Sequence, residues 1–567
     1  MRPVAHDLIL RDGLVVDGTG SAPYLADVAI DAGRIAAVVP TDKRSALQAK
    51  ESFDARGCWV TPGFVDPHTH LDAQLCWDPA AAPSNRHGVT TVIFGLCGFG
   101  VAPCPDGGGE YLLRSLEVVE EIPYASTREG VPFGWRSWRD FRDHIASQAL
   151  GVNAAGFVPH SALRYFAMGD RARVEPATAE DRQRMVAELE DALAAGAVGF
   201  ATSRGPNHVD GDHEPVPSRL ADARELQDLV AACRGRIWQI NVETKFSHDS
   251  AALIDEVERY AEWSRKAGAR LTWTPFYAEP GETVWQEVLD HNRRLNESGV
   301  EVSPQITAVP ITLMLRFEEG SFLTAIPGWA DALRGFFRLS PQEQKARLLD
   351  PKVRDAMKIE GVDPKHPLNP DFNYWTFTLC PSRPELSGRS LAEAALSDGV
   401  HPVDLLCDQV VRDDLATLID IPIFNRSQEG VLRFLEDPYT LLGLGDAGAH
   451  VMSVTNYRYP TFLLAKLVLQ EQALPLELAI NRLTQVPARL HGLRDRGVLS
   501  PGMAADVCVI DPERLRLGPV GVRHDLPGNS PRLYQAGIGY RAVFVNGRQT
   551  IENDEPTGAA PGEMLRA

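Results

Sequence analysis

The stretch Gly63-Phe64-Val65-Asp66-Pro67-His68-Thr69-His70 places two histidines, one residue apart, directly after an apolar run. On an extended strand, residues two apart share one face, so both imidazoles can reach a single metal ion. Active sites of parallel barrels lie at the carboxyl ends of their strands. The stretch therefore predicts a strand that ends at a metal site containing His68 and His70.

Apolar runs of four to eight residues recur along the chain and alternate with helical segments. This alternation is typical of parallel βα units. Eight such runs predict an α/β fold, a (β/α)₈ TIM-like barrel. The expected strands are 60–65, 90–95, 154–159, 197–202, 236–242, 270–274, 300–305 and 440–444.

Helix signals lie between these runs. Thr178 can cap a helix over 179–195, with Asp181 in its first turn and Gly196 at its end. The segments 251–267 and 475–491 have a comparable helical pattern.

Both ends of the chain have a β pattern of their own. We expect strands at 8–17 and 26–39, and again at 505–511 and 540–552, where Asn546-Gly547 is a strong hairpin signal. These segments predict a small β-sandwich made by both chain ends, 1–60 and 499–567. The barrel would then occupy 61–498, with an insertion at about 311–437, because that interval is too long for a simple connection.

Composition excludes several classes of protein. The 567 residues are 44% hydrophobic and 23% charged, as in globular proteins, and the net charge of −19 argues against a nucleic-acid partner. The absence of an apolar stretch of about 20 residues and of a signal peptide leads us to expect a cytoplasmic protein without a membrane partner. Eight scattered cysteines favour reduced thiols over a disulfide framework.

Two further residues can contribute to the metal site. Cys97 follows the run that ends at Phe94, and its thiolate would suit zinc, although a cysteine among apolar residues can also be a small core residue. Asp446 follows the last run, so it can bind a metal and take a proton from the attacking water, or simply cap a turn.

Taken together, these features resemble the amidohydrolase superfamily, and within it the N-acyl-D-amino-acid deacylase (D-aminoacylase) branch. The resemblance covers nearly the whole chain. It is carried by DGLVVDGTG (12–20), PGFVDPHTH (62–70), GVTTVIFGLCG (88–98), PHSALR (159–164), GAVGFATS (196–203) and RLTQVPARLHGLRDRGVLSPGMAADVCVID (482–511).

The resemblance implies a metal-dependent hydrolase in which His68, His70, Cys97 and Asp446 are zinc ligands and Asp446 is also the catalytic base. It also implies two more metal histidines on strands between the cysteine and the aspartate. The runs LTWTPF (271–276) and EVSPQITAVP (301–310) contain none. Glu243 or a carboxylated Lys245 could replace them, or both could be structural. We therefore expect one zinc site.

Other residues could bind substrate. His160 follows the third expected strand, Arg204 the fourth, and His450 lies four residues after Asp446. A substrate with a carboxylate needs a cation, and the arginine fork suits that role.

The leading hypothesis is hydrolysis of the amide bond of a small molecule, an N-acyl-D-amino acid, by metal-activated water with an aspartate base. One alternative is a cyclic amide or imide hydrolase on the same scaffold. Another is a barrel without metal that acts as a binding module. A homo-oligomer is compatible with each of these hypotheses.

Overall fold

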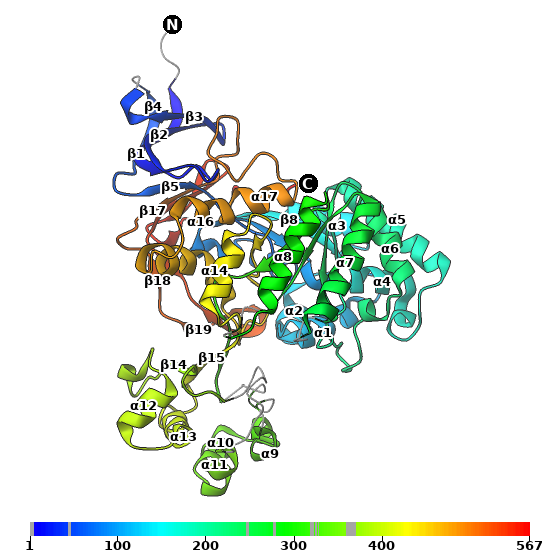
Figure 1. Ribbon diagram of the computed structural model, residues 1–567, viewed down its shortest axis with the longest axis vertical. Helices are drawn as coiled ribbons and strands as arrows, with labels where there is room; N and C mark the ends of the chain where they lie inside the picture. Colours follow the sequence, from blue (N-terminus) through cyan, green and yellow to red (C-terminus); the bar gives the residue numbers. More distant parts are fainter. Residues whose placement is uncertain are drawn as a thin grey trace.

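A computed structural model describes residues 5–43, 47–244, 249–275, 279, 281–317, 323, 326, 328–358 and 370–567 (Figure 1). Its centre is an all-parallel sheet with the strand order β16-β12-β11-β10-β9-β8-β7-β6. The predicted TIM-like barrel is confirmed, and each expected run overlaps one of its strands. These are β6 (Phe64–Asp66), β7 (Val89–Phe94), β8 (Asn153–Pro159), β9 (Gly199–Ser203), β10 (Ile237–Asn241), β11 (Arg270–Trp273), β12 (Val302–Ile306) and β16 (Leu441–Leu442).

The sheet closes through residues that follow its first and last strands. Thr69 and Ala447 form a parallel bridge, and the amide of His70 donates to the carbonyl of Ala447 at 2.7 Å. Glycine permits this close approach, because a Cβ on Gly448 would lie 2.5 Å from the carbonyl oxygen of His70. Closure therefore brings the H-x-H segment against the loop that carries Asp446.

The first expected run proves to be two strands in two different sheets. β5 (Trp59–Pro62) pairs with β1 (His6–Val15) and β17 (Val507–Ile510), whereas β6 follows after Gly63 and belongs to the barrel. Both strands are fully buried, so their side chains do not alternate between apolar and polar and the pattern does not reveal the change of sheet. Gly63 lies at the transition.

Both ends of the chain form one sheet with the order β24-β23-β22-β17-β5-β1-β2-β3, with β4 beside β1. The rings of Phe53 and Phe544, from strands far apart in this order, are 6.2 Å apart, so the sheet curls around its own core. Asn546 and Gly547, both at positive φ, form the expected hairpin turn. The strands are β1 (His6–Val15), β2 (Tyr24–Asp31), β3 (Arg34–Pro40), β4 (Ala49–Asp54), β5, β17 (Val507–Ile510), β22 (Tyr540–Val545), β23 (Arg548–Glu552) and β24 (Glu555–Pro556).

Not all of the C-terminal segment stays in this sheet. Short pairs β18 (Arg516–Leu517) with β21 (Gly537–Ile538), and β19 (Gly521–Leu526) with β20 (Ser530–Tyr534), lie outside it. The last residues run back to the barrel, where the amide of Leu565 donates to the carbonyl of Ala154 at 2.7 Å. The domain boundaries given above remain predictions.

Helices cover the outside of the barrel. The predicted cap is confirmed: the Thr178 side chain accepts from the amide of Asp181, the Asp181 side chain accepts in return, and Gly196 ends the helix at positive φ. The expected helix 475–491 is interrupted at Thr484, which has non-helical φ and ψ. The helices are α1 (Gly109–Val119), α2 (Tyr124–Gly130), α3 (Trp138–Ala146), α4 (His160–Met168), α5 (Ala179–Ala195), α6 (Ala223–Ala232), α7 (Ser250–Ala267), α8 (Val284–Glu297), α14 (Gln428–Glu436), α15 (Tyr459–Phe462), α16 (Leu476–Leu483) and α17 (Gln485–Leu490).

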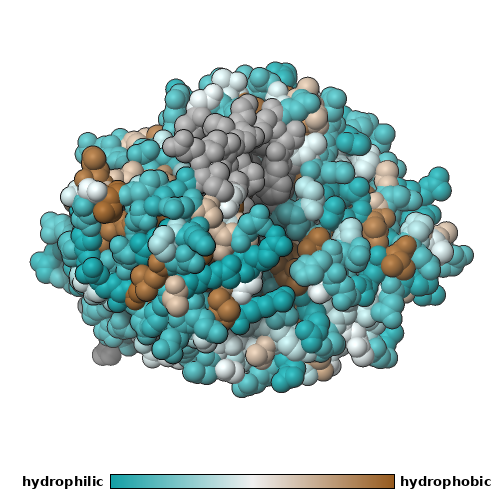
Figure 2. Space-filling view, turned by 90° about the horizontal axis from the view of Figure 1, so that it is seen from below, coloured by the Kyte–Doolittle hydropathy of each residue, from teal (hydrophilic) through white to brown (hydrophobic). Residues whose placement is uncertain are grey.

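The insertion forms a separate lobe in the lower part of Figure 1. An antiparallel sheet, β13-β15-β14, packs with short helices around its own apolar core. Figure 2, which views the molecule from this side, shows a mainly hydrophilic surface with apolar residues in small, scattered groups. The elements are β13 (Ile311–Leu315), α9 (Trp329–Ala332), α10 (Pro341–Leu348), α11 (Pro351–Met357), β14 (Thr376–Leu379), α12 (Leu391–Asp398), α13 (Pro402–Arg412) and β15 (Leu418–Phe424).

Among the described residues, no helix combines the length and the apolar character needed to cross a bilayer.

Candidate active site

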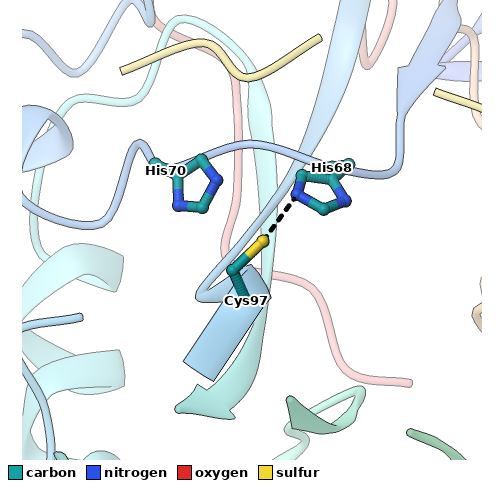
Figure 3. Close-up of side chains that lie close together, drawn as sticks. All are labelled: His68, His70 and Cys97. Carbon is teal, nitrogen blue, oxygen red and sulfur yellow. Dashed lines mark hydrogen bonds between the residues drawn. The ribbon is translucent and has the colours of Figure 1, made fainter. Parts of the chain in front are cut away.

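His68, His70 and Cys97 meet at the carboxyl ends of β6 and β7. Figure 3 shows both imidazoles projecting from one short segment, with the sulfur of Cys97 directed at His68. Nε2 of His68 lies 3.2 Å from that sulfur, and one ligand atom from each of the three residues lies within 4.8 Å of the others. All three residues are buried. The structure thus brings together the first three expected ligands.

Asp446 reaches the same point from the last strand. Its Oδ1 lies 3.5 Å from Nε2 of His68 and 3.8 Å from Nε2 of His70. Ligand atoms about 2.1 Å from a tetrahedral ion are themselves about 3.4 Å apart, so these separations fit one shared ion. Nitrogen, thiolate and carboxylate donors together suit zinc.

A hydrogen-bond chain orients the ring of His68. Its Nδ1 lies 2.6 Å from Oε1 of Gln305, and Nε2 of Gln305 donates to the hydroxyl of Thr272 at 3.0 Å. Because the amide oxygen faces the ring, Nδ1 of His68 carries the proton and Nε2 is left with its lone pair toward Cys97 and Asp446. Such partners fix the tautomer of a metal-binding histidine.

Glu120 performs the corresponding role for His70. Its Oε1 lies 3.2 Å from Nδ1 of His70, and both side chains are 4% exposed. Burial, helped by the charges of His68, His450 and His208, holds the pKa of His70 well below its usual range, so its imidazole is neutral as a ligand must be. Sequence reasoning missed Glu120; the adjacent acidic pair Glu120-Glu121 after the apolar end of α1 was the available signal.

Three residues at the site have a strained backbone conformation. Cys97, Asp446 and His450 all have positive φ, at 55°, 46° and 48°, although none is glycine. Non-glycine residues in this region are typical of positions where function holds the backbone. The neighbouring Gly445 is required for a different reason: a Cβ there would lie 2.1 Å from Oδ2 of buried Asp66.

His450 lies beside the ligand cluster, as expected. Its Nδ1 is 2.9 Å from Oε2 of Glu121, which also accepts from the hydroxyl of Ser453 at 2.6 Å. Burial opposes the charge of His450, but the hydrogen bond and charge of Glu121, with Glu120 and Asp446, raise its pKa to about 9. His450 is therefore a cation at neutral pH, and a third of its side chain is exposed.

His160 and Arg204 lie in other contacts. His160 is fully buried, and its ring nitrogens contact Thr202 at 2.7 Å and Glu225 at 2.9 Å. Arg204 donates to the carbonyls of Arg219 and Ala221 at 3.0 and 2.7 Å. Both ring nitrogens of His160 and Nη1 of Arg204 thus make contacts within the fold, and the expected role of the two residues in substrate binding stays a prediction.

Of the two proposed replacement ligands, Glu243 is not among the clustered residues. Glu243 is 65% exposed, and its carboxylate lies 3.6 Å from Arg204. Lys245 lies outside the described residues.

The strands between Cys97 and Asp446 present amides and hydroxyls to one another. Oε1 of Gln239 accepts from the amide of Cys97 at 2.9 Å, Nε2 of Gln239 donates to Asn241 at 3.4 Å, and the Thr274 hydroxyl also donates to Asn241. These side chains are buried and neutral. They are weak ligands for zinc compared with histidine or carboxylate.

Histidine, cysteine and aspartate side chains meet here at the carboxyl ends of the strands of a parallel barrel. This arrangement is typical of metal-dependent barrel enzymes. Comparison with known proteins identifies the family within this class. The model of the amidohydrolase family matches residues 51–325 and 431–551, and the interval between the two matches falls within the inserted lobe.

Two comparisons with individual proteins extend over the whole chain. It is 28% identical to N-acyl-D-glutamate deacylase of Alcaligenes xylosoxydans xylosoxydans, over 99% of this chain and 96% of that protein. The structure of N-acyl-D-glutamate deacylase from Bordetella bronchiseptica, complexed with zinc and a phosphonate inhibitor that mimics the tetrahedral intermediate, is 25% identical. It superposes with a TM-score of 0.65 and full coverage of both chains.

A D-aminoacylase structure, described in terms of a binuclear metal centre with one-metal activation and second-metal attenuation, is also similar. It is 25% identical, with a TM-score of 0.66 over 99% of this chain and 100% of the other. This chain belongs to the amidohydrolase family. It is a hydrolase of carbon–nitrogen bonds other than peptide bonds and is similar to the N-acyl-D-amino-acid deacylases.

Proposed function

We propose that this chain hydrolyses the amide bond of an N-acyl-D-amino acid with one zinc ion held by His68, His70, Cys97 and Asp446. The observation that carries the proposal is the cluster itself, in which donor atoms from three barrel strands lie at separations that suit one ion. The deacylase names of the full-length relatives support the substrate class.

The proposal of one ion rests on the interior of the barrel. Gln239, Asn241, Thr272, Thr274 and Gln305 hydrogen-bond one another or the ligand residues, so this side of the site is a neutral network. A second zinc ion would need anionic or imidazole donors there. For a similar D-aminoacylase, one metal is described as activating and a second as attenuating.

When bound, zinc would activate a water molecule and polarise the carbonyl group of the substrate. Asp446 accepts the proton of the attacking water as the oxygen adds to the carbonyl carbon. It then gives that proton to the leaving nitrogen when the carbon–nitrogen bond breaks. Asp446 is suited to this role because its side chain is 22% exposed, whereas those of His68 and His70 are almost completely buried.

His450 would bind the substrate carboxylate. It is positively charged at neutral pH, partly exposed and close enough to the cluster for Asp446 to influence its pKa. Glu121 holds the imidazole in place without covering it.

The experiment is hydrolysis of N-acetyl-D-glutamate, N-acetyl-D-aspartate and apolar N-acetyl-D-amino acids, with the L-enantiomers and hydantoin in parallel. We expect turnover of at least one D-substrate, and an Asp446→Asn variant slower by about 10²- to 10⁴-fold with unchanged thermal stability. Asp228→Asn, a surface change on α6, is the control. Equal activity of the Asp446 variant, or hydrolysis of hydantoin alone, would contradict the proposal.

A further inference from the structure

A large cavity lies at the opposite end of the barrel from the metal cluster. It has a volume of about 1030 Å³ and is bounded by the amino-terminal ends of β10 and β11, by α17 with the loop after it, and by the C-terminal residues. The metal ligands follow the carboxyl ends of the strands, so the height of the barrel separates the two places. The cavity therefore has no part in the hydrolysis proposed above.

Arginines dominate the wall of this cavity, although the whole chain has a net charge of −19. Its two acidic side chains, Asp495 and Glu563, both pair with Arg496, at 3.3 and 3.7 Å, and Asp495 also pairs with Arg34 at 3.4 Å. The acidic side chains are thus already engaged. The lining arginines are Arg142, Arg236, Arg270, Arg489, Arg494, Arg496 and Arg566.

Arg489, Arg494 and Arg566 are exposed and form no ion pair or hydrogen bond with the part of the chain that the structure describes. Arg236 donates to the main-chain carbonyl of Leu193 and to an oxygen of Ala567, the last residue of the sequence. Three exposed guanidinium groups therefore face one space without an anionic partner among the described residues.

Arg270 shows how closely these cations lie. Its side chain is three-quarters buried, its Nε has no hydrogen-bond partner in the described residues, and the carboxylate of Glu301 is 3.9 Å away. Burial lowers the pKa of Arg270, and the charges of Arg236, Arg494 and Arg489 lower it further against the effect of Glu301. A buried donor without an acceptor is costly, and so is a group of like charges. A bound anion in the cavity would relieve the repulsion among these cations.

We propose that this cavity binds a small polyanion carrying two or more phosphate or carboxylate groups. The guanidinium fork matches both oxyanions in bidentate geometry. Several arginines from separate elements favour a ligand with more than one anionic group over a single anion. Such a ligand would link the strand ends, α17 and the C-terminal residues, so it should also raise the melting temperature.

The test is calorimetric titration with inorganic pyrophosphate and with citrate, at low and at raised salt, with acetate as the single-charge control. We expect pyrophosphate or citrate to bind at low salt and to weaken with salt, and acetate to bind far more weakly. Tighter binding of pyrophosphate would assign the site to phosphorylated compounds, and tighter binding of citrate to polycarboxylates.

An Arg489→Ala/Arg494→Ala variant should bind at least about tenfold more weakly, because charge-assisted hydrogen bonds are lost. Arg224→Ala/Arg412→Ala, which removes two exposed arginines elsewhere, should bind like the wild type. The His68→Ala/His70→Ala variant should also retain binding, which excludes capture of the anion at the metal site. Failure of both polyanions to bind the folded protein at low salt, or equal binding by the Arg489/Arg494 variant, would overturn the proposal.

Discussion

The main-chain amide of Asp446 donates a hydrogen bond to the carbonyl of His68, with an N···O distance of 3.1 Å. This bond joins the segments that follow the last and first strands of the barrel. The contact that closes the sheet is therefore the contact that sets the distance between the aspartate and the histidines. Closure of the barrel and the position of Asp446 against the two histidines depend on the same contacts, so variants that loosen this seam should impair both.

Cys97→Ala should weaken zinc binding by more than about 100-fold. Loss of a mere supporting partner already costs about 10- to 100-fold, and Cys97 is expected to be a direct ligand. Chelator competition would measure the affinity, with Cys104→Ala, a buried cysteine in the following loop, as the control. Unchanged affinity in the Cys97 variant would assign this residue to packing.

Glu120→Gln should lower zinc affinity by about 10- to 100-fold, because the carboxylate 3.2 Å from Nδ1 of His70 orients that ring. The glutamine keeps the shape of the side chain, so the melting temperature of the metal-free protein should change little. Glu117→Gln, on the exposed side of α1, is the matched control. If both variants bind zinc like the wild type, the contact has no orienting role.

Glu225→Gln should destabilise the fold by about 3–5 kcal/mol, because it leaves the buried cation of Arg164 without its carboxylate. His160 would lose the carboxylate that its Nε2 contacts and keep its contact with Thr202. Urea denaturation measures the free energy of unfolding. Asp228→Asn, which breaks an exposed pair with Arg182 on the same helix, should cost less than about 1 kcal/mol. Similar values for the two variants would show that the buried pair contributes little.

Glu188 makes stability depend on pH. Burial raises its pKa to about 6, with smaller contributions from Asp191 and Asp140, against the amide of Trp138 and the charge of Arg139. The carboxyl group of Glu188 therefore binds its proton more tightly in the folded state than in the unfolded state. The stabilisation from the protonated carboxyl group is present at low pH and is lost as the pH rises through about 6.

Glu188→Gln cannot ionise, so the variant does not lose stability as the pH rises. The variant should be more stable than the wild type at pH 7.5, by at most about 2 kcal/mol, and the gain should vanish near pH 4. Denaturation at both pH values tests this, with Glu190→Gln on the exposed face of the same helix as the control. A gain that is equal at both pH values would contradict the assignment.

Much of the barrel could be predicted from sequence because its strands are short, apolar and separated by clear helix signals. Thr178, Asp181 and Gly196 mark one helix to the residue, since capping is local chemistry. The run 60–65 shows the limit. Two consecutive buried strands in different sheets have the same apolar pattern, so the boundary at Gly63 was not predictable from periodicity.

The candidate site divides in the same way. His68, His70, Cys97 and Asp446 each follow a strand, so their meeting could be expected from parallel topology. Glu120 and Gln305 could not be predicted, because they reach the histidines from a helix end and a distant strand. Arg204 illustrates the converse. It follows a strand as expected, and the sequence pattern could not show that its Nη1 donates to two nearby carbonyls; its role in substrate binding stays a prediction.

The most direct test of the central claim is metal content per chain, measured by elemental analysis on protein purified without chelators, for the wild type and the His68→Ala/His70→Ala variant. One zinc ion per wild-type chain, lost in the variant, is the predicted result. Two ions per chain would contradict the single site. No metal after zinc is added back, or equal content in the variant, would contradict the cluster as the metal centre.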